Sequence, residues 1–296
     1  MTSGFARTLS ILIAMALGAL VPQAHAFSWA IRWTIVVMLF LVFLQTRLSR
    51  TGLQRSHLTL LAVNIGLGYF GWGVGWLAGG RDLALVGFFA GITPTAIAAP
   101  VIISFLRGRV DYVVMAFLLS NVAIPVLLPV LLPLVLGRTT PDVMVQVLGS
   151  MVFVVFAPML GAWLLRALHP AAAEWPSRLR NFSFALWVTT MFLVTANASE
   201  FLRQHADTPH LLLAKIALLT LLMAAVNFGV GRLIGGPKFG REASQALGQK
   251  NTTFAIYLAL SYASPLVALG PTCYVLWHNL WNSWQLHQGS RRESGD

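Results

Sequence analysis

The stretch "GITPTAIAAPVI", residues 91–102, places Pro94 and Pro100 in the middle of an apolar segment long enough to cross a bilayer. Each proline lacks a backbone N–H, and its ring clashes with the preceding helical turn. A helix through this stretch is therefore expected to open at the prolines rather than run straight. A simple proline kink, which is common in membrane helices, is the alternative.

A second apolar segment, at about 241–264, contains the polar stretch "LGQKNTT", residues 247–253. Gly248 allows the chain to unwind, and Asn251, Thr252 and Thr253 can cap a new helix after it. Lys250 lies roughly 13 Å of helix into this segment at 1.5 Å per residue, which is near the centre of a bilayer. An ionisable group at that depth is costly and indicates function. The alternative is a lysine that extends along polar neighbours toward the interface.

The composition places these two stretches in a membrane protein. Of the 296 residues, 57% are hydrophobic and 10% are charged, and the mean hydropathy is +0.75. Soluble chains carry roughly a quarter charged residues. Apolar segments of membrane-crossing length recur along the chain. They predict an all-α integral membrane protein with ten spans, at about 8–22, 28–47, 57–78, 83–106, 110–136, 143–168, 179–198, 210–232, 241–264 and 267–285.

Basic residues predict the orientation of these spans. Most of the 20 Lys and Arg lie at the N-terminus, in alternate loops and at the C-terminus: Arg7, Arg47, Arg50, Arg55, Arg107, Arg109, Arg166, Arg178, Arg180, Arg232, Lys238, Arg241, Arg291 and Arg292. By the positive-inside rule both termini are cytoplasmic, in an inner (plasma) membrane. The formal net charge of +11 is spread over short loops, which argues against a nucleic-acid partner.

The first segment has a second interpretation. Residues 1–28 have a basic start, an apolar middle and an "AHA" ending, which together resemble a cleavable signal peptide. Cleavage would leave nine spans and break the agreement between span count and loop charge. We therefore expect an uncleaved first helix. The single cysteine, Cys273, excludes an internal disulfide and a cysteine-rich metal site.

Ten spans divide into two sets of five with opposite orientation, and the two interrupted stretches fall in the fourth span of each set. Transporters built from inverted repeats bind substrate near the bilayer midplane, where such discontinuous helices expose their half-helix ends. Freed backbone groups at this depth must be buried in protein or line a wet cavity. The matching positions of the two breaks therefore favour a transporter.

Three segments carry a family resemblance. They are "TPTAIAAPVIISFLRGRVDYVVMAFLLSNVAIPVLLPVLLP" at 93–133, "ALGQKNTTFAIYLAL" at 246–260 and "YVLWHNLWNSW" at 274–284. In order and spacing the chain resembles the bile acid:sodium symporter family. The resemblance implies two inverted five-helix repeats, a panel of helices at about 8–47 and 143–198, and a core at about 57–136 and 210–285. It also implies that broken helices 4 and 9 cross, and that the substrate is a bile acid, steroid conjugate, pantoate or similar organic anion.

The departures from that family concern its sodium sites. Ala99 and Pro100 stand where the family has a Ser-Asn pair. Ala246 stands in the place of its Glu, and Lys250 in the place of its Gln. A substrate-facing threonine of the family is Ile97 in this chain. The family's substrate-facing asparagine is retained as Asn251. Sodium binding needs several oxygen ligands, preferably with a carboxylate. The chain is therefore expected to be independent of sodium, with no metal and no cofactor.

These observations lead to a hypothesis in which Lys250 supplies the positive charge that sodium supplies in relatives. Its ammonium is expected to satisfy exposed backbone carbonyls and to attract an anionic substrate, helped by the half-helix dipoles. The predicted substrate site comprises Lys250, Asn251, Thr252, Thr253, Thr95, Pro94 and Pro100. Because burial disfavours a charged amine, Lys250 could also exchange a proton during transport. It could equally stay charged in a uniporter or exchanger.

Other assignments remain open at this stage. The partners expected are a small organic anion and the lipid bilayer, for a monomer or a homodimer. Asn64, Ser120, Asn121, Asn227, Asn279 and Asn282 are weaker candidates to line the substrate cavity, and we expect them rather to bond across helices. His278 is expected to pack and hydrogen-bond rather than bind metal. A nucleophile–base pair is not evident at midspan, so we expect no enzymatic activity. The alternatives are a sodium-coupled symporter with other ligands, a passive channel, and a non-transporting membrane sensor or enzyme.

Overall fold

The computed structural model describes residues 3–45, 53–204 and 210–294, and regular structure in these ranges is helical apart from one isolated β-bridge. By length and composition, five helical stretches can cross a membrane: Arg55–Gly79, Val110–Leu136, Pro141–Leu168, Asn181–Gln204 and His210–Gly248. These helices agree with the prediction of an all-α membrane protein. The count of ten spans and the inverted repeat stay predictions. Arg47 and Arg50, used for the orientation, lie outside the described residues.

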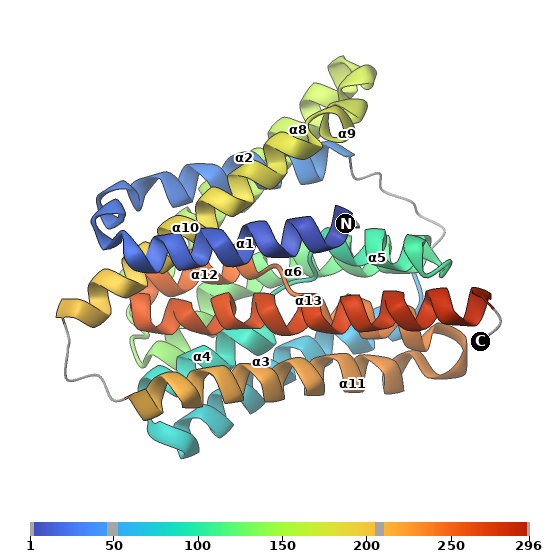
Figure 1. The fold of residues 1–296 in the computed structure, drawn as a ribbon. Coiled ribbons are helices and arrows are strands. Elements are labelled where there is room, and N and C mark those ends of the chain that lie inside the picture. Colours follow the sequence, from blue (N-terminus) through green and yellow to red (C-terminus); the bar gives the residue numbers. More distant parts are fainter. Residues whose placement is uncertain (1–2, 46–52, 205–209, 295–296) are drawn as a thin grey trace. The chain divides into compact units, whose positions relative to one another are not determined.

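The helices follow the apolar segments of the sequence closely (Figure 1). In chain order they are α1 (Ser3–Leu20), η1 (Pro22–Phe27), α2 (Trp29–Gln45), α3 (Arg55–Gly79), α4 (Arg81–Ile92), α5 (Ala98–Phe105), α6 (Val110–Leu136), α7 (Pro141–Met151), η2 (Val152–Phe156), α8 (Ala157–Leu168), η3 (Pro170–Glu174), α9 (Trp175–Arg178), α10 (Arg180–Gln204), α11 (His210–Gly248), α12 (Thr252–Tyr262) and α13 (Pro265–Ser294).

The chain forms two compact units. Unit 1 comprises residues 1–47, 125–208 and 256–269, and unit 2 comprises 48–124, 209–255 and 270–296. Within unit 1, α1 packs along α10 and α2 along α8. Within unit 2, α3, α4 and α11 run side by side (Figure 1). Both interrupted stretches of the sequence belong to unit 2.

Glycines bring α3 and α4 into direct backbone contact. A Cβ atom at Gly71 would meet the carbonyl of Gly87, and one at Gly87 would meet the carbonyl of Gly71. One helical turn along, a Cβ at Gly75 would meet the carbonyl of Leu83. Small residues at a helix interface permit this close approach in membrane proteins. The contact fixes the position of α4, whose last turn leads into the first interruption.

This packing makes a prediction for two glycines on one helix. Gly71→Ala is expected to lower the thermal unfolding temperature of the purified protein, because the added methyl group displaces α4. Gly73→Ala, two residues away with open space around its Cβ, is expected to be neutral or slightly stabilising, by up to about 1 kcal/mol from helix propensity. Equal effects of the two substitutions would contradict the close packing of α3 on α4.

A turn inside α11 joins two segments that the sequence predicts as separate spans, 210–232 and 241–264. The backbone leaves helical geometry at Gly236, with φ 57° and ψ −154°, and at Phe239. The positive φ favours glycine at position 236. Beyond the turn the chain packs back on itself, since the Ser244 hydroxyl donates to the Phe228 carbonyl at 2.7 Å. The turn thereby carries "LGQKNTT" back along the first part of α11, within unit 2.

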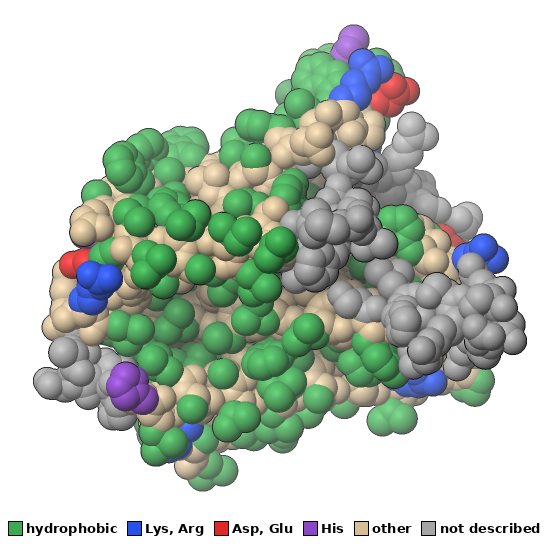
Figure 2. Space-filling model, in the orientation of Figure 1, with side chains coloured by type: hydrophobic (Ala, Val, Ile, Leu, Met, Phe, Trp, Pro, Cys, Tyr) green, Lys and Arg blue, Asp and Glu red, His purple; other side chains and the backbone are tan. Residues whose placement is uncertain are grey.

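The helices expose many large apolar side chains. Leu77, Leu168 and Leu233 are each more than 70% exposed. Figure 2 shows hydrophobic side chains over much of the visible surface, with few charged ones. At the same time, buried positions include polar residues such as Asn64, Asn227 and Lys250. An apolar exterior over a partly polar interior suits a chain surrounded by lipid.

Candidate functional site

The first interruption lies between α4, which ends at Ile92, and α5, which begins at Ala98. Thr93 leaves the helix with φ −58° and ψ 139°, an extended conformation that the residue before a proline favours. Pro94 therefore lies in the break, as the sequence predicts. Pro100 lies outside the break, in the first turn of α5. Backbone N–H groups in a first turn have no partner within the helix, so a proline there removes no helical hydrogen bond.

The second interruption lies between α11, which ends at Gly248, and α12, which begins at Thr252. The Asn251 side-chain oxygen accepts a hydrogen bond from the Phe254 N–H at 3.2 Å, so Asn251 caps α12. Thr252 and Thr253 are buried in the first turn of that helix. Capping by a polar residue after Gly248 is what the sequence predicts.

The two interruptions lie against each other within unit 2. The Ala96 N–H donates to the Gln249 carbonyl at 2.7 Å, and the Asn251 N–H donates to the Pro94 carbonyl at 2.8 Å. Thr95 and Lys250 thereby form an antiparallel β-bridge. The two extended segments thus supply hydrogen-bond partners for some of each other's backbone N–H and carbonyl groups, which have no helical partners at the breaks. We call this contact the crossing and define it by residues 93–97 and 249–251.

Lys250 is buried at the crossing, with 2% of its surface exposed. Its Nζ donates to the Gly91 carbonyl at 2.6 Å and to the side-chain oxygen of Asn64. Asn64, on α3, in turn donates to the Ile92 carbonyl at 2.9 Å. The carbonyls of the last turn of α4 have lost their helical partners at the break. The ammonium therefore satisfies an exposed carbonyl, as expected from the sequence.

Asn227 and Tyr274 donate hydrogen bonds to two further carbonyls beside the breaks. The Ala90 carbonyl has no helical donor, because the residue four positions later is Pro94, which lacks an N–H. Asn227 donates to this carbonyl at 3.0 Å instead. Asn227 also donates to the Tyr274 hydroxyl, which itself donates to the Gly248 carbonyl at 2.8 Å. One hydrogen-bonded chain thus connects the last turns of α4 and α11.

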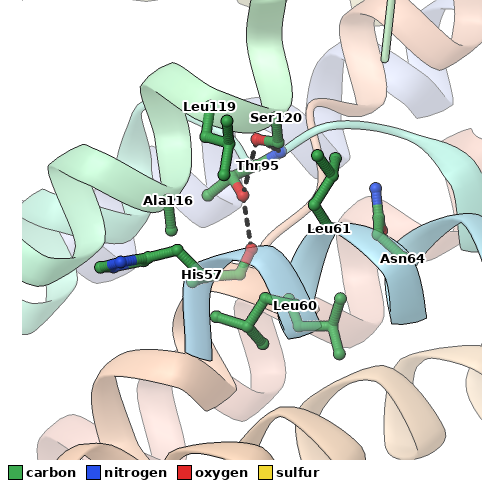
Figure 3. Close-up of a pocket in the computed structure, with 10 residues that line it drawn as sticks. His57, Leu60, Leu61, Asn64, Thr95, Ala116, Leu119 and Ser120 are labelled. Atoms are coloured by element: carbon green, nitrogen blue, oxygen red, sulfur yellow. Dashed lines mark hydrogen bonds between the residues drawn. The ribbon is translucent and has the colours of Figure 1, made fainter. Parts of the chain in front are cut away.

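Thr95 links the crossing to α6 and α11. Its hydroxyl donates to the Ala246 carbonyl at 2.6 Å, its N–H donates to the Ser120 hydroxyl at 3.1 Å, and its carbonyl accepts from Asn121 at 2.8 Å. Figure 3 shows Thr95 and Ser120 facing one another beside Asn64. The cavity that these residues line measures about 10 Å³, which is room for roughly one water molecule. This cavity is too small for an organic anion.

The predicted site residues are only partly brought together. Lys250, Asn251, Thr95 and Pro94 meet at the crossing, Thr252 and Thr253 follow on α12, and Pro100 lies beyond it on α5. The expectation that Asn64, Asn121 and Asn227 bond across helices is confirmed.

Sequence reasoning missed two partners at the crossing. It did not assign Asn64 to Lys250, which is 186 positions away. It also overlooked Tyr274, although this residue opens the polar "YVLWHNLW" stretch. A buried tyrosine usually needs a hydrogen-bond partner, and that was the available signal.

Comparison with known proteins adds no assignment: no family model matches the chain, and no curated protein matches its sequence.

Proposed function

We propose that the chain is a secondary transporter that moves a small or amphipathic organic anion across the inner membrane by alternating access, without sodium. The observation that carries the proposal is the crossing, where two helices break within an apolar chain and a buried ammonium joins them. Broken helices that meet in this way form the substrate sites of inverted-repeat transporters. The proposal includes ten spans in two inverted repeats and a panel and core as the resemblance implies.

The charge balance at the crossing supports an anionic substrate. Among the described residues, no carboxylate lies within ion-pair distance of Lys250, whose Nζ bonds two uncharged oxygens instead. A buried charge without a counter-charge is costly. An anion that binds beside the crossing supplies this counter-charge, and so Lys250 favours anions over neutral or cationic solutes.

The partners of Lys250 support independence from sodium. Its Nζ bonds the carbonyl oxygen of Gly91 and the amide oxygen of Asn64, which are the kind of oxygen ligands that a hard cation takes. The Lys250 ammonium therefore takes the position that a sodium ion would need among these oxygens. The cavity beside it has no room for an organic anion, so the proposal includes a second conformation in which substrate reaches the crossing.

Flux measurement tests the proposal. Purified protein is reconstituted into liposomes, and uptake of labelled organic anions is compared with that of protein-free liposomes. We expect saturable uptake of at least one anion, which is recovered chemically unchanged and is competed by the unlabelled compound. Recovery of a new chemical species would indicate an enzyme instead. Binding without uptake would indicate a sensor and contradict transport.

A further inference from the structure

Unit 1 contains a second and much larger cavity, of about 630 Å³. It lies among the start of α2, the middle of α7, the end of α10 and the second half of α12, and its lining includes Trp29, Arg32, Ser150, Asn197, Tyr257 and Tyr262. Cavities that hold small organic ligands measure roughly 300–1,000 Å³ and combine apolar walls with a few polar groups. The sequence-predicted site residues do not line this cavity.

Arg32 is the charged residue among those that line the cavity. Its guanidinium carbon lies over the Phe153 ring, 4.2 Å from the ring centroid, which is a cation–π contact. In the described part of the chain, no carboxylate forms an ion pair with Arg32. A guanidinium in such a contact can still donate its N–H groups to a ligand, and their fork geometry matches a carboxylate or sulfonate.

The element that carries Phe153 is itself unusual. Residues Val152–Phe156 form a π-helical turn between α7 and α8. Pro158, in the first turn of α8, has no N–H for the Val154 carbonyl, which favours the wider turn. The turn places Phe153 against Arg32 and also against Trp33, whose ring centroid lies 5.5 Å away at 83°. Such turns occur frequently at functional sites.

Side-chain hydrogen bonds hold the walls of the cavity in place. The Tyr262 hydroxyl donates to the Ser150 hydroxyl at 2.5 Å and joins α12 to α7. The Asn197 amide donates to the Ser28 hydroxyl at 2.9 Å and joins α10 to the start of α2. A cavity whose walls are already connected needs little ordering when a ligand binds.

We infer that this cavity binds an amphipathic organic anion, with its carboxylate or sulfonate on Arg32 and its ring body against Trp29 and Trp33. The mixture of one arginine, tryptophan and tyrosine faces, and neutral hydrogen-bonding groups fits a ligand with one acidic group on an apolar body. The inference rests on unit 1 alone. It goes beyond the proposed function, because binding here requires neither Lys250 nor flux.

A matched pair of probes tests the inference. Calorimetric titration of the detergent-purified protein uses naphthalene-1-acetate and the neutral naphthalene-1-acetamide, which differ in charge and little in shape. We expect the acid to bind on the order of tenfold or more tightly than the amide. Arg32→Gln is expected to remove this preference, whereas Arg32→Lys keeps the charge without the fork and retains part of it. Arg138→Gln, at an exposed arginine in the loop after α6, is the control and leaves the affinity unchanged.

Two results would overturn the inference. One is equal affinity for the acid and the amide in the wild type, and the other is wild-type affinity for the acid in Arg32→Gln. An anionic lipid headgroup presents the same chemistry, so the titration is repeated in nanodiscs of phosphatidylcholine with and without phosphatidylglycerol. We expect the acid to bind in both. Its displacement by phosphatidylglycerol would assign the cavity to a headgroup and reject the soluble anion.

Discussion

Lys250→Met is expected to abolish uptake of the organic anion in proteoliposomes, down to the level of protein-free liposomes. Methionine keeps the length of the side chain but removes its charge and donors, so the Gly91 carbonyl and the Asn64 oxygen lose their partner. Each buried acceptor left without a donor costs about 1–3 kcal/mol. The variant is therefore also expected to unfold at a lower temperature, which circular dichroism can measure.

Two control variants separate the loss of charge from the loss of stability. Tyr274→Phe removes a hydrogen bond to the Gly248 carbonyl at the same crossing and leaves the ammonium in place. We expect it to be destabilised to a similar extent yet to transport. Lys215→Met removes a half-buried lysine whose Nζ donates to the Ala78 carbonyl, far from the crossing in sequence, and we expect nearly wild-type uptake. Uptake by Lys250→Met at the rate of Tyr274→Phe would reject the role of Lys250 in transport.

Much of the helical layout could be predicted from the sequence because it depends on local chemistry. Apolar segments separated by Gly, Pro and charged clusters predict where helices lie, and a proline after Thr93 predicts a break. The turn at Gly236 and Phe239 was predictable as a loop, since "GGPKFGRE" interrupts the apolar pattern. The effect of Pro100 was not, because a proline in a first turn and a proline in a helix interior look alike in sequence.

The contacts of the site were less predictable, because they join residues far apart in the chain. Lys250 and Asn64 meet only once α3, α4 and α11 have packed through their glycines. Several buried asparagines are equally plausible partners from sequence alone. The cavity around Arg32 was not predictable, because its lining comes from α2, α7, α10, α12 and the start of α13, which lie far apart in the sequence. The contact between Arg32 and Phe153 depends in addition on the π-helical turn at Val152–Phe156.

Independence from sodium is the second large effect that we expect. At the positions where the sodium symporter family that the sequence resembles has sodium ligands, this chain carries Ala99, Pro100 and Ala246, none of which has a side-chain oxygen. At the crossing the Nζ of Lys250 already bonds two oxygens that a cation would otherwise use. Because a sodium ion placed there would meet an ammonium at close range, like charges would repel it. We therefore propose that a sodium gradient does not drive transport through the crossing.

The most direct measurement is uptake of one labelled organic anion into proteoliposomes with sodium outside, compared with the same vesicles after complete replacement of sodium by potassium. The two initial rates are expected to be equal in the wild type, and both are expected to be lost in Lys250→Met. Uptake that occurs only with sodium would contradict the assignment of Lys250 as the cation of the site.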